Sequence, residues 1–521
     1  MIIMPEKQSN EEKNKALKTI AKGGSIVFIG LVFARAFSYL FRIVVARFLG
    51  SSVYGLYSLG LAVFSVLVAV SLMGVDSGIQ RFIPYYSGKR EDRVRGILKS
   101  GLRISMPVGL VFSFILVVFS PQLSVILFNN PSMSLVLRVF GLLIPFKIFS
   151  DNLKSVVIGL KKIKYDVYSS KFLNIGSKFL LTILLIFMGL EILGVLAAFF
   201  IATIIGLIAL IYFLVFKLHY FDFDKSSFSV KKMFLYSWPL VIATIFMQVI
   251  GWTDVLMMGY FLSESQVGIY NAALPTAMIL PFFLIGINRI IFPVFSELYG
   301  KKNLSELRRV YQVTTKWVFA LTIPFFLVMF LFPRQLLLTL FGSEYLPAAF
   351  SLSILALAYF YHASMGAVGG LLKTIGKTKV FALVTGVSAT VNIALNWLLI
   401  PVYGIVGGAV ATGVAIFLYN TLWLFFVYKK IKVHPFTFSY VKTGLSGLLS
   451  VLLVFLSLNI LFESPSIFIY IIGFFIFVLL YSLFSLLAGV LEQEDLMLMK
   501  AVERKLGINL GFVRRIIKRF T

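Results

Sequence analysis

Long apolar segments alternate with short polar ones along almost the whole chain. A helix that crosses a lipid bilayer needs about 20 mainly apolar residues. Fourteen segments meet this requirement, at residues 23–45, 53–74, 101–120, 135–159, 172–189, 193–216, 233–259, 268–294, 313–332, 347–370, 380–400, 405–427, 444–461 and 467–490. The polar segments between them leave no room for a sizeable soluble domain. The pattern therefore predicts an all-α polytopic membrane protein with about 14 transmembrane helices.

The composition narrows the class of protein further. Of the 521 residues, 60% are hydrophobic and 13% are charged, whereas soluble proteins have about 25% charged residues. This composition excludes a soluble enzyme. The chain has no cysteine and only 3 histidines, which are scattered. Disulfides, thiol chemistry and cysteine-ligated zinc are therefore excluded, and a histidine metal site is not expected.

The formal net charge of +27 is distributed unevenly among the polar segments. Lys and Arg gather in every second one, in residues 1–22, 81–103, 161–171, 217–232, 301–309, 373–379, 429–442 and 491–521. Because basic loops stay on the cytoplasmic side, both termini of this multi-pass protein of the cell membrane are predicted to lie in the cytoplasm. Residues 1–22 then form a cytoplasmic lead-in, and residues 491–521 end in a basic amphipathic helix suited to the membrane surface. Topology accounts for most of the charge, and no nucleic-acid partner is expected.

The chain also contains an internal duplication. Four positions recur 213 residues later: Phe48 as Phe261, Gly55 as Gly268, Tyr57 as Tyr270 and Gly194 as Gly407. Each copy holds six predicted spans, which gives a first lobe at 23–216 and a second at 233–427. Two parallel six-helix lobes are a transporter architecture with the substrate site between them. Two further predicted helices, within 444–490, lie outside the duplication.

Several phrases of the sequence are typical of one family. They are Arg47-Phe48-Leu49-Gly50 with Tyr54-Gly55-Leu56-Tyr57, Gly268-Ile269-Tyr270-Asn271-Ala272-Ala273, and Asn396-Trp397-Leu398-Leu399-Ile400-Pro401 with Gly404. In their order and spacing they resemble the polysaccharide/oligosaccharide flippases, the Wzx-like polysaccharide transporters of the multidrug/oligosaccharidyl-lipid/polysaccharide (MOP) exporter superfamily. That superfamily also holds the multidrug extrusion (MATE) transporters and the lipid II flippases.

The resemblance implies a fold and a function. It implies a V-shaped carrier of two lobes that translocates a polyprenyl-diphosphate-linked oligosaccharide from the cytoplasmic to the outer leaflet by alternating access. The expected partners are this lipid-linked sugar diphosphate and membrane lipids, with glycan-assembly enzymes as further candidates and a monomer as the expected state. A cation-coupled MATE-like multidrug exporter and a lipid II-type peptidoglycan precursor flippase remain as alternatives.

Five basic residues lie deep inside the predicted spans of the first lobe: Arg35, Arg42, Lys147, Lys154 and Lys178. A base at the bilayer centre costs about 2.5–3.5 kcal/mol, so five facing lipid would cost roughly 12–18 kcal/mol. They are therefore predicted to face a water-filled cavity or one another. Pairing within the bundle, and snorkelling of Lys154 and Lys178 toward the membrane surface, are the alternatives.

The nearby acids are too few to neutralise these bases. Asp151 lies one helical turn from Lys147 and from Lys154, and Asp76 could take a second base. An excess of about three positive charges remains, and it calls for an anionic substrate such as a diphosphate, which Arg binds in a bidentate way. The predicted substrate-binding residues are these five bases and Arg289, which lies near the cytoplasmic face.

The second lobe holds a candidate sodium site. Asp254 is the one buried acid there, Asn392 and Asn396 lie one turn apart, and Thr412 lies on the following span. Hard cations prefer such oxygen ligands. The set looks like the sodium site of lipid II flippase relatives, except that Asn396 stands where an acid is expected. A hydrogen-bond network centred on Asp254 is the alternative, and sodium, protons or the membrane potential could each drive transport.

An enzyme is not expected. A membrane glycosyltransferase would need catalytic acids at the outer face, and the outer loops offer only Glu191, Glu264, Glu344 and Glu463, scattered and without histidine or aspartate partners. No nucleotide-binding motif and no resident cofactor is predicted.

Overall fold

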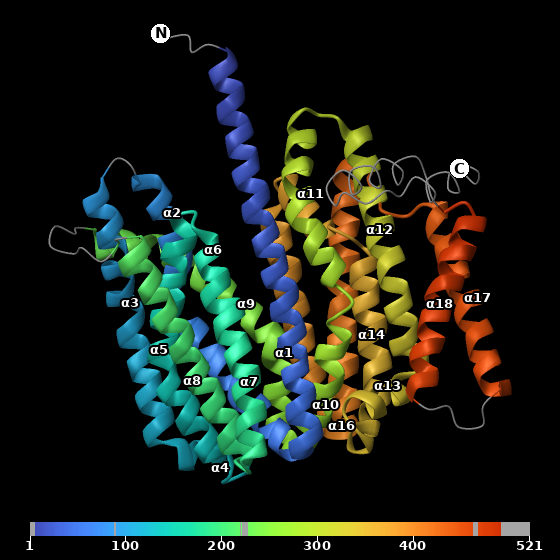
Figure 1. The fold of residues 1–521 in the computed structure, drawn as a ribbon, viewed down its shortest axis with the longest axis horizontal. Helices are drawn as coiled ribbons and strands as arrows, with labels where there is room; N and C mark the ends of the chain where they lie inside the picture. Colours follow the sequence, from blue (N-terminus) through green and yellow to red (C-terminus); the bar gives the residue numbers. More distant parts are fainter. Residues whose placement is uncertain (1–5, 88–89, 219, 221–227, 462–466, 491–521) are drawn as a thin grey trace. The chain divides into compact units, whose positions relative to one another are not determined.

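The computed structural model describes residues 6–87, 90–218, 220, 228–461 and 467–490 (Figure 1). Every regular element within these ranges is a helix. Ten of the described helices are long and apolar enough to cross a membrane, or eleven if one bent pair counts as a span. The prediction of an all-α, multi-pass membrane protein is thus confirmed. The predicted amphipathic tail at 491–521 lies outside the described residues.

Two of these ten helices are broken by a glycine. Helix α1 (Glu6–Ser71) has a left-handed backbone at Gly50, with φ 80°, and α16 (Thr378–Ile431) has one at Gly404, with φ 56°. Such a φ suits glycine because a side chain would clash with the backbone. Gly50 falls between the predicted spans at 23–45 and 53–74, and Gly404 between those at 380–400 and 405–427.

The chain divides into two compact units, Met1–Ala272 and Ala273–Thr521. The first unit holds α1, α2 (Val75–Tyr86), α3 (Glu91–Val118), α4 (Ser120–Phe128), α5 (Met133–Gly159), α6 (Ile163–Asp166), the π-helix η1 (Val167–Leu173), α7 (Asn174–Phe187), α8 (Glu191–Tyr212), the π-helix η2 (Phe213–Lys217), α9 (Val230–Phe261) and the first part of α10 (Glu264–Ala277). Helix α3 packs on α5 and α7 on α8, while α1 contacts α5, α7 and α9. An aromatic cluster joins three of these helices, where the ring of Phe140 lies 6.1 Å from that of Tyr57 and 5.4 Å from that of Phe199.

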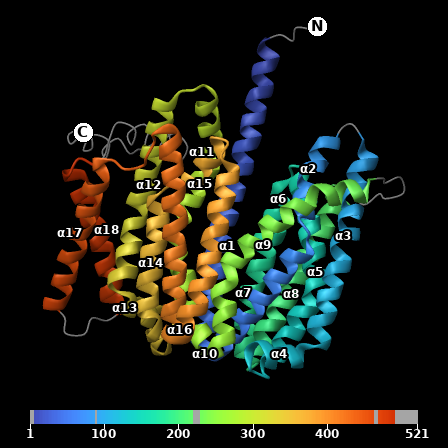
Figure 2. The same ribbon diagram turned by 180° about the vertical axis from the view of Figure 1, so that it is seen from behind.

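The second unit continues α10 and adds α11 (Phe282–Gly300), α12 (Leu304–Leu331), α13 (Pro333–Leu340), the short 3₁₀ helix η3 (Ser343–Ala348), α14 (Ala349–Ser364), α15 (Val368–Thr374), α16, α17 (Phe438–Leu461) and α18 (Ile467–Leu487). Helix α14 packs on α12 and α16. Helices α17 and α18 lie side by side (Figure 2). They contact α12, where the Tyr481 hydroxyl donates to the Ala320 carbonyl at 2.9 Å.

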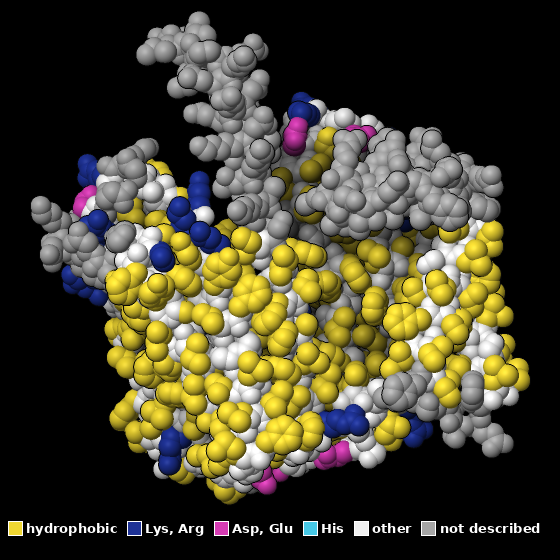
Figure 3. Space-filling model, in the orientation of Figure 1, with side chains coloured by type: hydrophobic (Ala, Val, Ile, Leu, Met, Phe, Trp, Pro, Cys, Tyr) yellow, Lys and Arg dark blue, Asp and Glu magenta, His cyan; other side chains and the backbone are white. Residues whose placement is uncertain are grey.

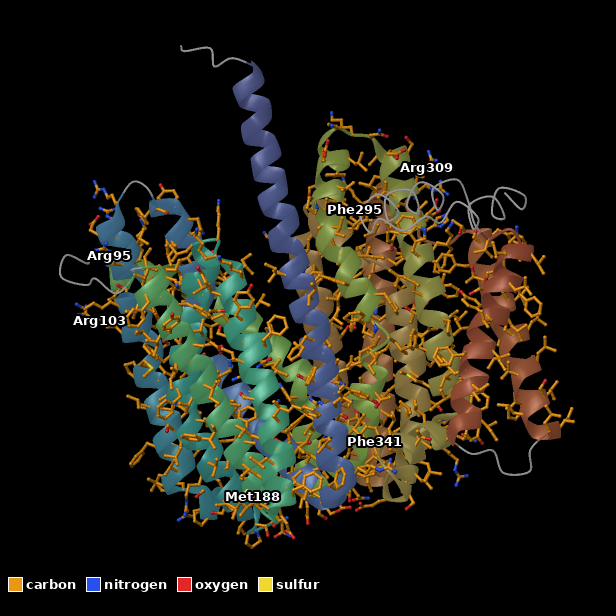
Figure 4. The ribbon with its side chains drawn as sticks, viewed as in Figure 1. Arg95, Arg103, Met188, Phe295, Arg309 and Phe341 are labelled. Atoms are coloured by element: carbon orange, nitrogen blue, oxygen red, sulfur yellow. The ribbon has the colours of Figure 1, made fainter. Side chains whose placement is uncertain are left out.

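Basic residues of the predicted cytoplasmic loops share one end of each unit. In the first unit, Arg95 and Arg103 lie near the end opposite Met188 (Figure 4). In the second unit, Arg309 lies at the end opposite Phe341. Hydrophobic side chains cover much of the surface between the two ends (Figure 3). This separation of charge from the apolar surface is typical of a protein that spans a bilayer.

Residues equivalent in the predicted duplication meet where two helices of the first unit cross. A Cβ atom on Gly55 would overlap the carbonyl oxygen of Glu264, and one on Gly268 would overlap that of Ser51. Gly268 stands 213 residues after Gly55, and Glu264 stands 213 residues after Ser51. The contact is therefore reciprocal, as it would be across a two-fold axis. Glycine at both positions is what permits the two backbones to touch.

Candidate functional site

Arg42 is held in the first unit by hydroxyl groups rather than by a carboxylate. Its Nη1 donates to the Tyr54 hydroxyl at 3.2 Å, and that hydroxyl donates to the Asn271 carbonyl at 3.0 Å. Tyr54 and Asn271 are buried, and Arg42 is half-buried. Arg35, two turns earlier on α1, is exposed. The tyrosine positions Arg42 without cancelling its charge.

Lys178 packs against aromatic rings. Its Nζ lies 4.3 Å from the ring centroid of Phe41 on α1 and 5.4 Å from that of Phe199 on α8. An ammonium over a ring face is attracted by the negative face of the π-system, and the ring has no net charge that would neutralise it. Lys178 therefore belongs to the packed region between α1, α7 and α8, which periodicity alone did not predict.

The two lysines of α5 are paired. Lys147 Nζ lies 2.5 Å from Asp151 Oδ1, which confirms the predicted pairing one turn apart. Lys154 Nζ lies 3.9 Å from Asp166 Oδ1, and this carboxylate also accepts a hydrogen bond of 2.8 Å from the Ser170 hydroxyl. The side chain of Asp166 is only 9% exposed, so Lys154 and Ser170 replace much of its hydration.

Asp166 is a residue that the sequence analysis missed. It precedes the π-helix η1, an irregularity that is frequent at functional sites and that hydropathy does not reveal. One signal was available, because Lys154 and Asp166 stand equally far along the chain from Leu160, the residue at the turn between α5 and α6. Residues at equal distances from a tight turn between antiparallel helices face each other. Asp76, the other predicted partner, forms no ion pair within 4.0 Å with any described side chain.

Arg35, Arg42 and Lys178 thus remain as cations without a carboxylate within 4.0 Å in the described part of the chain. They are carried by α1 and α7, which pack together. Of the five bases predicted deep in the spans, these three lack a described carboxylate neighbour, while Lys147 and Lys154 each have one. Arg289 lies on α11, and its side chain is outside the described residues.

The predicted sodium ligands are distributed over both units. In the first unit, Asp254 on α9 is buried and accepts a hydrogen bond of 2.9 Å from the Tyr270 hydroxyl. In the second unit, Asn392 and Asn396 are buried on α16, and Asn392 Nδ2 donates to Thr412 Oγ1 at 3.4 Å. Asn392 and Thr412 therefore lie together. Among the described residues, no three His, Cys, Asp or Glu side chains cluster in a way that could hold a metal ion.

These features define a multi-pass α-helical membrane protein of the transporter type. Three basic residues on its apolar helices have no carboxylate neighbour among the described side chains. The chain belongs to the family of polysaccharide biosynthesis proteins, whose family model matches residues 20–299. The model of the MatE family matches residues 239–398. The predicted membership in the MOP exporter superfamily is confirmed.

Several relatives cover most of the chain. An uncharacterized membrane protein of Methanocaldococcus jannaschii is 25% identical over 446 residues, which are 81% of this chain and 86% of the relative. A protein of Haloferax volcanii named as a probable low-salt glycan biosynthesis flippase is 25% identical over 411 residues, or 77% of this chain and 82% of the relative.

The fold is shared with solved structures. The lipid II flippase MurJ in an inward closed conformation is similar with a TM-score of 0.71 at 18% identity, covering 88% of this chain and 97% of MurJ. An inward-facing MATE-family multidrug resistance transporter of the MOP superfamily has a TM-score of 0.68 at 15% identity, covering 76% and 94% of the two chains. Family and relatives together support a membrane flippase or exporter.

Proposed function

We propose that this protein is a flippase that translocates a polyprenyl-diphosphate-linked oligosaccharide from the cytoplasmic to the outer leaflet by alternating access. The observation that carries the proposal is the set of three bases on α1 and α7, Arg35, Arg42 and Lys178, that have no carboxylate partner in the described structure. The resemblance to a glycan biosynthesis flippase supports the same substrate class.

The chemistry of the three bases suits a diphosphate. Two arginines on one face of α1 can each donate a pair of hydrogen bonds to phosphate oxygens, and a lysine adds a compact positive charge. Arg42 is already oriented by Tyr54, so little side-chain freedom is lost when it binds an anion. The prenyl chain would stay in the bilayer while the diphosphate and the sugar pass along these bases.

The proposed topology has 14 spans. The breaks at Gly50 and Gly404 divide α1 and α16 into two spans each, which supports this number. In this topology the lobes at 23–216 and 233–427 form a V, both termini are cytoplasmic, and the protein works as a monomer with glycan-assembly enzymes as partners. The same proposal includes coupling of transport to sodium, to protons or to the membrane potential. A coupling sodium ion would bind at Asp254, Asn392, Asn396 and Thr412.

A MATE-like exporter of cationic drugs is the second candidate, because the MatE model matches and solved MATE transporters share the fold. A cation exporter needs acidic groups in its path. Helix α1 instead carries Arg35 and Arg42 within its apolar part and no acid from Ile26 to Ser71. The charge of this helix therefore favours an anionic substrate.

Transport into sealed proteoliposomes distinguishes the two candidates. A fluorescent short-sugar polyprenyl diphosphate is incorporated into the membrane, and an impermeant quencher reports the exposure of its headgroup with and without a sodium gradient. Protein-dependent translocation of this lipid, and none of a cationic dye, is the expected result. Movement of the dye without translocation of the lipid would contradict the proposal. Arg35→Glu is expected to abolish lipid translocation while the protein still folds.

A further inference from the structure

A second group of cations lies in the first unit, where α2 ends and α3 and α9 begin. We call it the Tyr86 cluster, and it consists of Arg81, Phe82 and Tyr86 from α2, Arg93 from α3, and Lys232 and Tyr236 from α9. None of these residues belongs to the predicted substrate-binding set. Lys and Arg side chains are visible at this end of α2 and α3 in Figure 3.

Aromatic groups hold each of the three cations. Lys232 Nζ donates to the Tyr86 hydroxyl at 2.8 Å. The guanidinium carbon of Arg93 lies 5.2 Å from the ring centroid of Tyr86, and that of Arg81 lies 4.3 Å from the ring centroid of Tyr236. Three helices thus bring three positive charges onto one connected aromatic surface.

The aromatic framework is itself fixed by packing. Phe82 and Tyr86 are buried, and the ring of Phe228 lies 5.2 Å from that of Phe82 and 5.9 Å from that of Tyr86. Beside them, the Tyr220 hydroxyl donates to the Val94 carbonyl, which ties the start of α3 to the chain before α9. The aromatic side chains that contact the cations are therefore fixed in position.

The positive charge of the cluster is not neutralised. Among the side chains that the structure describes, no carboxylate lies within 4.0 Å of Arg81, Arg93 or Lys232. Ring faces attract cations but carry no net charge. The hydrogen bond from Lys232 and, after it, the influence of Arg93 lower the pKa of the Tyr86 phenol, the direction expected for a group beside positive charges.

The surroundings of the cluster place it at the level of lipid headgroups. Tyr85, Phe234, Leu235 and Trp238 are exposed next to it, and the rings of Phe234 and Trp238 stack at 6.0 Å. Exposed Trp and Tyr side chains are typical of the membrane–water interface. A soluble protein surface would not combine three cations with this much exposed apolar area.

We propose that the Tyr86 cluster binds the phosphate of an anionic bilayer lipid. Arg81 and Arg93 can bind phosphate oxygens in a bidentate way, Lys232 supplies a point charge, and the exposed aromatic and apolar side chains contact the acyl region. Basic sites between helices at the cytoplasmic interface bind anionic headgroups by this chemistry. The bound lipid would join the ends of α2, α3 and α9.

Native mass spectrometry of the full chain tests the proposal with phosphatidylglycerol and phosphatidylcholine of equal acyl chains. Each of Arg81→Gln, Arg93→Gln and Lys232→Gln is expected to weaken phosphatidylglycerol binding about fivefold. Lys231→Gln is the matched control, because this neighbouring lysine is exposed and carries the same charge. It is expected to leave the affinity unchanged, as is every variant for phosphatidylcholine.

Three results would overturn the proposal. Equal weakening by Lys231→Gln would mean that only the overall surface charge matters. Inorganic diphosphate that displaces phosphatidylglycerol equally from the wild type and from the variant Arg81→Gln/Arg93→Gln/Lys232→Gln would place the lipid elsewhere. Binding of a polyprenyl diphosphate that depends on the three cations, without binding of phosphatidylglycerol, would assign the cluster to the transport substrate. Thermal unfolding of each variant verifies that it is folded.

Discussion

Replacing Gly55 by alanine tests the reciprocal crossing of the two repeats. The added Cβ would overlap the Glu264 carbonyl oxygen, and the other nearest atoms are also backbone, the Glu264 carbonyl carbon and the Gly268 nitrogen. Backbone atoms cannot rotate away as a side chain can, so the two helices must separate. Overpacking costs about 1–3 kcal/mol, and alanine regains about 0.5–1 kcal/mol of helix propensity. Because the overlap is with backbone, the upper end of the overpacking range applies, and we expect a net loss of roughly 2 kcal/mol in the free energy of unfolding.

The assay is reversible unfolding in mixed micelles, titrated with a denaturing detergent. Gly251→Ala on α9 is the matched control, since a Cβ there meets nothing within 4 Å. This control is expected to be neutral or slightly stabilising. Gly268→Ala should cost as much as Gly55→Ala, and the double variant less than the sum, because one separation of the helices relieves both overlaps. A Gly55→Ala variant as stable as Gly251→Ala would refute the reasoning.

Two further predictions follow from single contacts. Lys154→Met removes the cation beside the Asp166 carboxylate and leaves the hydrogen bond from Ser170, so it should lower the free energy of unfolding by about 1–3 kcal/mol. Adding Asp166→Asn should restore most of this loss, and no recovery in the double variant would argue against the pair. Lys232→Gln removes the hydrogen bond that lowers the Tyr86 pKa, so phenolate formation should move to higher pH. Isotope-labelled tyrosine followed by NMR through a pH titration measures this shift, and an unchanged titration would contradict the contact.

Local spacing predicted the features that depend on one helix. The apolar runs predicted the membrane helices, and the spacing of Lys147 and Asp151 predicted their ion pair, because residues four apart on a helix are neighbours. The 213-residue offset predicted that Gly55 and Gly268 are equivalent. Each of these follows from helix geometry or from repetition along the chain.

Contacts that require several packed helices were not predictable in this way. Lys178 meets Phe41 and Phe199 only because α7 packs on both α1 and α8. Lys232 reaches Tyr86 across 146 residues of sequence. The spacing of residues along one helix does not predict contacts between helices. Aromatic partners of a cation are also uncharged, so charge pairing in the sequence does not predict them.

The central claim is that three uncompensated bases bind the diphosphate of the substrate, and its most direct test is the initial rate of lipid translocation in proteoliposomes. The triple variant Arg35→Gln/Arg42→Gln/Lys178→Gln is compared with Arg138→Gln. Arg138 lies near the start of α5, away from the three bases, and contacts Ser120. We predict that the triple variant flips the fluorescent polyprenyl-diphosphate sugar no faster than protein-free vesicles, while Arg138→Gln keeps the wild-type rate. A folded triple variant that translocates this lipid at the wild-type rate would contradict the account.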